Sequence, residues 1–152
     1  MIRNTKHALA MTLVAAMAFG VVGVAASSTD VIKDRQHAME NVRDAMMALA
    51  AIAKGEAPFD AAVVKESAAT MEDHLRKAST LFPEGSAQGD VETWAKAEVW
   101  SDHADFVVKF KAAQAAAESL KSVTEESAFR PALGKLGNSC KSCHETYRRP
   151  KQ

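Results

Sequence analysis

A cluster of two cysteines and a histidine, all potentially reactive, lies close to the C-terminus of this sequence. The stretch reads Cys140-Lys141-Ser142-Cys143-His144, and the 152-residue chain has no other cysteine. Residues three or four apart share one face of a helix, so both thiols and the imidazole would lie on one side of a single turn. This C-x-x-C-H spacing predicts thioether bonds from Cys140 and Cys143 to one haem c, with His144 as an iron ligand.

Zinc, a redox dithiol and a disulfide are the alternatives for this motif. A structural zinc site needs a fourth ligand, and no second Cys or Cys/His pair lies elsewhere at a suitable spacing. A thioredoxin-like dithiol belongs in a βαβ setting, and no strand-like run precedes the motif. A disulfide across two residues would leave His144 unexplained. The haem interpretation uses all three side chains.

The first 26 residues have the pattern of a secretory signal peptide. Arg3 and Lys6 precede an apolar run over residues 8–22, and small residues follow at 24–26. The alternative is a transmembrane anchor, but the run is short for a span of about 20 residues. We therefore expect cleavage after residues 1–26 and export to the periplasm.

Residues 27–152, the chain expected after cleavage, have the length of one domain. Loss of Arg3 and Lys6 leaves 17 basic side chains against 19 acidic ones. This balance does not resemble the basic footprint of a nucleic-acid-binding protein. No stable membrane insertion is expected after cleavage. No constellation of catalytic acid, base and nucleophile stands out, so we do not expect an enzyme.

Four stretches carry apolar residues at the 3/4 spacing of amphipathic helices, and none shows the alternation of a β-strand. They cover residues 29–54, 61–81, 96–121 and 128–149. Gly55 ends the first stretch, and Pro83 lies in the connection after the second. Such helices, joined mostly by short loops, predict an all-α fold: an antiparallel up-down-up-down four-helix bundle.

The haem motif lies on the core-facing line of the last stretch. This line runs through Phe129, Leu133, Leu136, Cys140, Cys143 and Tyr147. Small side chains on the third stretch, such as Ala113 and Ala117, leave room for a flat ring or simply allow close helix packing. We expect the bundle to enclose one haem. His103 lies on the apolar line of the third stretch, where we expect a buried histidine hydrogen-bonded to a neighbour.

Two segments carry a resemblance to a known family. One is Arg35-Gln36-His37-Ala38-Met39 in the first helical stretch, and the other is segment 140–148, in which Tyr147-Arg148 follows the haem motif. Both resemble the class II cytochromes c, the cytochrome c′ family. The position of C-x-x-C-H near the C-terminus is also typical, because class I cytochromes c carry it near the N-terminus. The resemblance covers residues 27–152 and implies a periplasmic haem protein.

The resemblance gives Met39 a role. In typical members the matching residue is a non-ligating apolar side chain, and the five-coordinate iron is open to nitric oxide or carbon monoxide. In a low-spin branch this residue is Met and its sulfur is the sixth ligand, which is what the resemblance implies here. A methionine that only fills the core is the alternative.

The low-spin branch implies an electron carrier that meets redox partner proteins. The alternative is a protein that binds gas at an open or displaceable sixth iron position. Homodimers through the first two helices also occur in the family.

Two arginines are the remaining candidate haem contacts. Arg35 interrupts the inward line one turn before Met39, where an unpaired charge would be costly. Pairing with a haem propionate would resolve this cost, and a side chain that reaches the surface is the alternative. Arg148 is four residues after His144, so the two can lie close together. The resemblance implies that Arg148 lines the proximal haem face, and a role at the helix C-terminus is the alternative.

Overall fold

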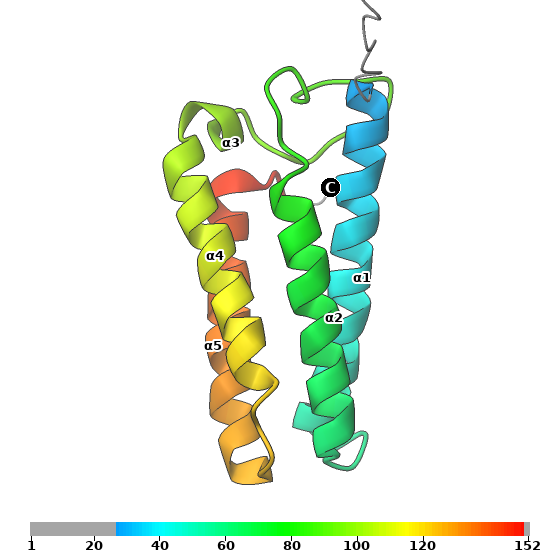
Figure 1. Cartoon of the computed structure of the whole chain (residues 1–152), viewed down its shortest axis with the longest axis vertical. Coiled ribbons are helices and arrows are strands. Elements are labelled where there is room, and N and C mark those ends of the chain that lie inside the picture. The colour runs from blue at the N-terminus through cyan, green and yellow to red at the C-terminus, as the bar shows by residue number, and fades with distance from the viewer. Residues whose placement is uncertain (1–26, 151–152) are drawn as a thin grey trace, which may run out of the picture.

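The computed structural model describes residues 27–150 of the chain. The predicted signal peptide, residues 1–26, lies outside the described residues. Within residues 27–150 the chain forms five helices and no strand (Figure 1). They are α1 (Ser28–Lys54), α2 (Ala61–Ser79), α3 (Glu98–Ser101), α4 (His103–Leu120) and α5 (Glu126–Tyr147).

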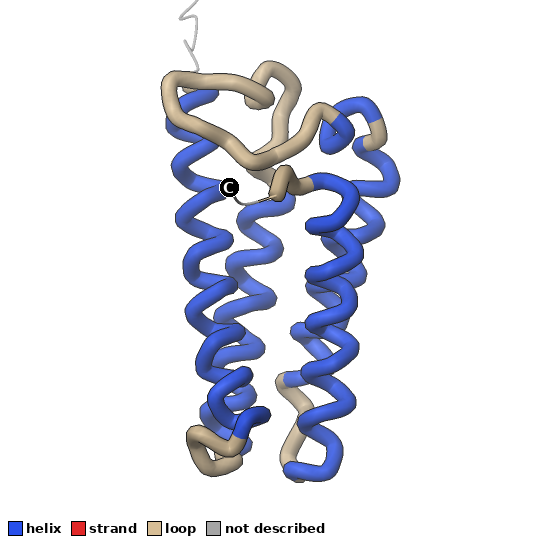
Figure 2. Tube along the Cα trace, turned by 180° about the vertical axis from the view of Figure 1, so that it is seen from behind, coloured by secondary structure: helices blue, strands red, loops and turns tan. Residues whose placement is uncertain are grey.

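The four long helices run up and down beside one another, with short connections at the lower end of Figure 1 and a long loop at the upper end. α1 packs against α2, α2 against α4, and α4 against α5. α1 and α5 stand as separate columns in the view from behind (Figure 2), and their backbones approach closely at very few points. The predicted antiparallel four-helix bundle is confirmed. None of the helices in this part of the chain is long and apolar enough to cross a membrane.

The ends of the first two helices follow sequence signals. The Ser27 side chain accepts a 3.1 Å hydrogen bond from the Asp30 backbone N–H at the start of α1. Gly55 ends α1 at φ 77°, a left-handed conformation that favours glycine. Asp60 begins α2 by accepting a 2.7 Å bond from the Ala62 N–H. Both helices therefore match the predicted stretches closely.

The third predicted helix is divided in two. The prediction of a single helix over residues 96–121 is wrong, because Asp102, at φ −125° and ψ 49°, separates α3 from α4. Aspartate competes with the helix for backbone hydrogen bonds, and the Asp102 carboxylate lies 3.3 Å from the Tyr147 hydroxyl. His103, directly after the break, is exposed, so the prediction of burial is also wrong. Its Nδ1 does lie within hydrogen-bond distance, 3.1 Å, of the Val99 carbonyl oxygen.

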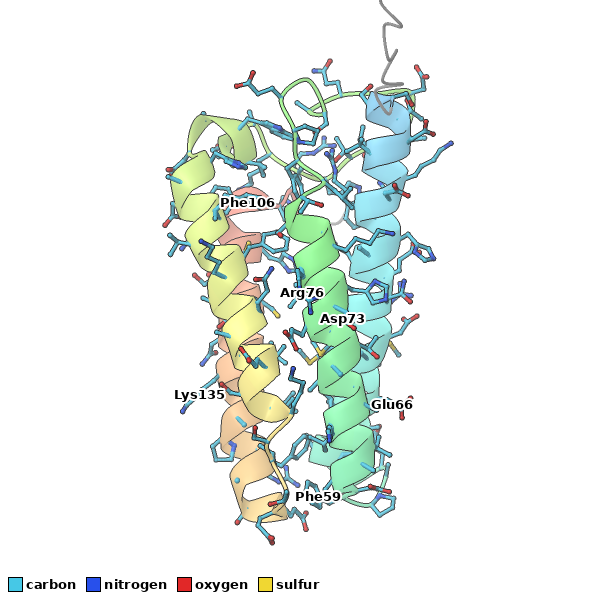
Figure 3. The ribbon with its side chains drawn as sticks, viewed as in Figure 1. Phe59, Glu66, Asp73, Arg76, Phe106 and Lys135 are labelled. Atoms are coloured by element: carbon cyan, nitrogen blue, oxygen red, sulfur yellow. The ribbon has the colours of Figure 1, made fainter. Side chains whose placement is uncertain are left out.

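Aromatic side chains lie at both ends of the core. At the lower end the ring centroids of Phe59 and Phe129 are 5.7 Å apart. Near the upper end Phe106 lies 4.8 Å from Phe82 and 5.0 Å from Phe110. Figure 3 labels Phe59 and Phe106, which mark these two levels. The haem motif, in the last two turns of α5, lies toward the Phe106 end.

The loop over residues 80–97 covers the upper end and is joined to α1 by hydrogen bonds. Arg35 of α1, only 3% exposed, donates to the Ser86 carbonyl oxygen at 2.9 Å and to the Thr93 hydroxyl at 2.8 Å. Its guanidinium also lies 5.0 Å from the ring centroid of Phe82. Arg35 therefore holds a polar loop over the part of the bundle that contains the haem motif.

Candidate haem site

A small cavity of about 40 Å³ lies between the helices at the level of the haem motif. Cys140, Cys143 and His144 of α5 line it, and so does Met39 of α1. The other lining residues come from α1, α2 and α4 and are Val42, Leu75, Lys109, Phe110 and Ala113. The structure thus brings together the four side chains for which the sequence suggested covalent attachment or iron binding.

The end of α5 is held in place by the loop beside it. Ala95 and Arg148 form a short antiparallel bridge. The Arg149 N–H donates to the Trp94 carbonyl oxygen at 2.7 Å. The helix itself continues to Tyr147, so the whole motif is helical and its three reactive side chains share one face, as the spacing predicted.

Tyr147 fixes the same helix from its inner side. It is buried, and its hydroxyl donates to the Asp105 carboxylate of α4 at 2.6 Å. Its ring lies 5.2 Å from that of Phe106. Burial, followed by the hydrogen bond to Asp105, raises the pKa of Tyr147, which stays protonated and able to donate. These two contacts join the end of α5, which carries the motif, to α4.

Both thiols are less acidic than ordinary cysteines. Burial raises the pKa of Cys140. Burial also raises the pKa of Cys143 to about 11, with a smaller contribution from Cys140 and an opposing one from the charge of Lys109. A thiol-exchange site depends on a lowered thiol pKa. The folded chain provides the reverse, which argues against the redox-dithiol alternative.

His144 lies at the boundary between the cavity and solvent, because it lines the cavity and is also an exposed residue. Partial burial of the ring lowers the pKa of His144, and the charge of Arg148 lowers it further. Both effects favour the neutral imidazole, the form that binds a metal.

Arg148 is close to His144, as the spacing predicted. The Arg148 N–H donates to the His144 carbonyl oxygen at 3.1 Å and ends the helix. The guanidinium of Arg148 lies 4.8 Å from the ring centroid of Trp94. Arg148 therefore lies at the C-terminal end of α5, as one of the two alternatives predicted. A contact of Arg148 with the proximal haem face stays a prediction.

Arg35 does not line the cavity. It lies one turn before Met39 on α1, with its guanidinium hydrogen-bonded to the loop. Because Arg35 is buried, the alternative of a side chain that reaches the surface is wrong. Pairing with a haem propionate stays a prediction.

Sequence reasoning missed Lys109, which lines the cavity from α4. Its Nζ lies 3.3 Å from the Ser142 hydroxyl and 3.7 Å from the Asp105 carboxylate. Lys109 is next to Phe110 and off the apolar line, a pattern that also describes an ordinary solvated lysine. No signal in the sequence distinguishes the two.

A family model described as Cytochrome C' matches residues 30–148. The chain belongs to the cytochrome c′ family. Cytochrome c′ of Rhodopseudomonas palustris is 37% identical over 130 residues, 85% of this chain and 88% of the relative. Cytochrome c-556 of Agrobacterium fabrum is 34% identical over 140 residues, 90% of this chain and 94% of the relative. A nitric oxide complex of a mutant cytochrome c′ from Alcaligenes xylosoxidans has a TM-score of 0.74 at 32% identity, covering 83% of this chain and 98% of that one.

As a member of the cytochrome c′ family, the protein has one covalently attached haem c with iron. The residues present fit this group: two thiols for the thioethers, and an imidazole and a thioether of the types that bind haem iron. The α1 and α5 backbones do not pack closely, and Met39 of α1 and His144 of α5 line the same cavity. The predicted family, cofactor and bundle are all confirmed.

Proposed function

We propose that this cytochrome c′-family protein is a periplasmic carrier of single electrons, in which His144 and Met39 would bind the haem iron. One observation carries the proposal. Met39, in the middle of α1, lines the same cavity as Cys140, Cys143 and His144 near the end of α5. A methionine that only filled the core could have lain at any level of α1.

Haem supplies a one-electron couple between ferric and ferrous iron, and the residues around it set the potential. A Met39 thioether bound to the iron together with the His144 imidazole would favour the ferrous state and raise the potential. Retention of both ligands in both states would limit rearrangement during electron transfer. Val42, Leu75 and Phe110 of the cavity wall are buried and apolar, so they give the Met39 side of the cavity an apolar lining.

Met39→Leu is the direct test, because leucine keeps an apolar side chain and removes the sulfur. The ferric variant should change from six-coordinate and low-spin to five-coordinate and high-spin. Its reduction potential should fall, and the ferrous form should bind carbon monoxide much faster than the wild type.

Met46→Leu is the matched control. Met46 is also partly buried on α1, but it lies two turns away, about 10 Å along the axis, and does not line the cavity. Its spectrum and potential should equal those of the wild type. If Met39→Leu also left both unchanged, Met39 would be a core residue only, and the proposal would fail.

The second candidate function is binding of nitric oxide or carbon monoxide at an open or displaceable iron position. The observation that favours it is the nitric oxide complex of the Alcaligenes relative. A wild-type ferrous protein that binds carbon monoxide as fast as Met39→Leu would support this function over electron transfer. We propose no catalysed reaction, and the names of the relatives denote cytochromes.

The periplasmic location rests on the signal pattern in residues 1–26. Mass spectrometry of the purified periplasmic fraction should find residues 27–152 plus one haem. A full-length chain retained in the cytoplasm without haem would contradict this part of the proposal.

A further inference from the structure

A second pocket, of about 510 Å³, opens beside the haem site. Its lining residues are Lys96, Lys141, His144, Glu145, Arg148, Arg149 and Pro150. Of all the residues that line either pocket, only His144 lines both. His144 therefore lies between the inner cavity and this outer pocket, so a molecule in the outer pocket lies beside one of the two proposed iron ligands.

The outer pocket is surrounded by positive charge. Lys96, Lys141, Arg148 and Arg149 form a basic rim, and Glu145 is the one carboxylate that lines the pocket. The whole chain has equal numbers of basic and acidic side chains, 19 of each. The basic rim is therefore a local concentration of positive charge and does not reflect a basic protein.

The charges of the rim are only partly offset. Lys141 Nζ lies 3.7 Å from the Glu145 carboxylate, and Arg149 lies 3.8 Å from the Glu92 carboxylate. All four side chains are more than half exposed, and exposed pairs of this kind contribute little free energy. Arg148 lies over the ring of Trp94, which does not neutralise it.

Lys96 completes the rim, and its Nζ donates to the Glu145 carbonyl oxygen at 3.1 Å. Among the described residues, two carboxylates are paired with these four cations, so a net positive charge is presented to solvent beside His144.

We propose that the basic rim is the docking surface for an acidic face of a partner redox protein; this inference rests on the electron-carrier function proposed above. In the exchange, one electron leaves the reduced partner and converts ferric iron to ferrous, and no bond forms or breaks. Electron transfer slows steeply with distance, so a partner on a pocket that shares His144 with the haem site is well placed. Opposite charge also speeds and orients the encounter.

The test uses the ferric holoprotein and reduced flavodoxin, an acidic one-electron donor, mixed in a stopped-flow instrument at several salt concentrations. The rim variants are Lys141→Glu, Arg149→Glu and the double variant. The matched controls are Lys65→Glu and Lys135→Glu, singly and together. Both lysines are exposed and line neither pocket; Lys65 lies near the start of α2 and Lys135 in the first half of α5. Figure 3 labels Lys135.

The double rim variant should lower the second-order rate constant about tenfold or more at low salt. The wild-type rate should fall as salt rises, and the rim variant should show a flatter dependence. The dissociation constant for oxidised flavodoxin should rise in parallel. The double control should retain nearly the wild-type rate and affinity.

Three results would overturn the inference. The first is an equal loss in the rim and control variants, which would show an effect of net charge alone. The second is a wild-type rate that does not depend on salt. The third is inhibition by inorganic phosphate as strong as that by polyglutamate at matched ionic strength, which would identify a small-anion site.

The absorption spectrum and reduction potential of each variant are measured first. These measurements distinguish failure of the docking inference from failure of the proposed electron-carrier function. A high-spin ferric wild type would contradict the proposed His/Met electron carrier. Normal spectra and potentials in the rim variants, with unchanged rates of electron transfer from flavodoxin, would contradict only the proposed docking surface. Arg149 also donates to the Thr93 carbonyl oxygen, so the single variant Lys141→Glu, whose side chain is 72% exposed, tests the rim without disturbing the loop.

Discussion

The lower end of the bundle, at the α1–α2 and α4–α5 connections, and the upper end, at the haem site, are built from different interactions. The lower end closes with the Gly55 turn, the Asp60 cap and contact between Phe59 and Phe129. The upper end combines a polar loop over residues 80–97 with the reactive side chains of the cavity. The lower end is complete with protein groups alone, whereas the upper end gathers groups suited to a cofactor.

This difference implies that stability and haem chemistry are largely separable. Substitutions at the lower end should change the free energy of unfolding and leave the spectrum as it is. Substitutions at the upper end should change the haem, its ligands or the loop above it.

The largest effect is expected from removal of both haem cysteines at the upper end. Cys140→Ala combined with Cys143→Ala should reduce covalent haem from one per chain to none, because no other thiol is present. Intact mass and haem staining after denaturation measure this. Ser142→Ala, between the two cysteines, is the control and should keep its haem. Covalent haem in the double variant would contradict the assignment.

Next in size is Phe129→Ala at the lower end. Phe129 is only 1% exposed, and removal of a buried aromatic side chain costs about 3–5 kcal/mol of unfolding free energy. Denaturant unfolding measures the loss, and the haem spectrum of the folded variant should stay unchanged. Val63→Ala, at a 40% exposed site on α2, should cost roughly 0.5 kcal/mol or less. A spectral change in Phe129→Ala would show that the two ends are coupled.

Arg35→Leu should have an intermediate effect, centred on the loop. The Ser86 carbonyl and Thr93 hydroxyl would lose a buried donor, which costs roughly 1–3 kcal/mol. Hydrogen exchange should accelerate in residues 86–93. Gln36→Ala removes one exposed bond to the Glu92 carbonyl oxygen and should do much less. Unchanged exchange in Arg35→Leu would mean that the loop is held by other contacts.

The smallest effect concerns the ion pair between Glu72 of α2 and Lys121 after α4. The hydrogen bond from Lys121 lowers the pKa of Glu72 below 4.5, and the same bond raises the pKa of Lys121 above 10.5. The contribution of Glu72 to the free energy of unfolding is therefore present above pH 4.5 and is lost as the pH falls through its lowered pKa. The contribution of Lys121 is lost only as the pH rises through its raised pKa.

Unfolding of the wild type and of Glu72→Gln at pH 7 and pH 3 tests this pair. The difference in the free energy of unfolding between the two proteins should be smaller at pH 3 and in high salt than at pH 7 and low salt. A difference that is constant with pH would assign the effect to packing instead of charge.

The parts predictable from sequence were those with local signals. The caps at Asp60 and Gly55 follow from residue type, and C-x-x-C-H needs only one helical turn. The break at Asp102 could not be predicted, because it accompanies a hydrogen bond to Tyr147, 45 residues away. The loop partners of Arg35 are similarly distant in sequence, so periodicity identified its inward position and not what it contacts.

Met39 shows the same limit at the site. Its spacing on α1 is that of any core residue, and only the resemblance selected it over Met46. Its place on the cavity wall depends on how α1 packs relative to α5, which no local pattern encodes.

The electron paramagnetic resonance and absorption spectra of the ferric wild-type holoprotein report directly on which side chains bind the iron. If Met39 and His144 both bind the iron, the spectra should show a six-coordinate, low-spin centre with a weak thioether-to-iron charge-transfer band in the far red. A five-coordinate, high-spin ferric centre in the wild type would contradict the His/Met assignment.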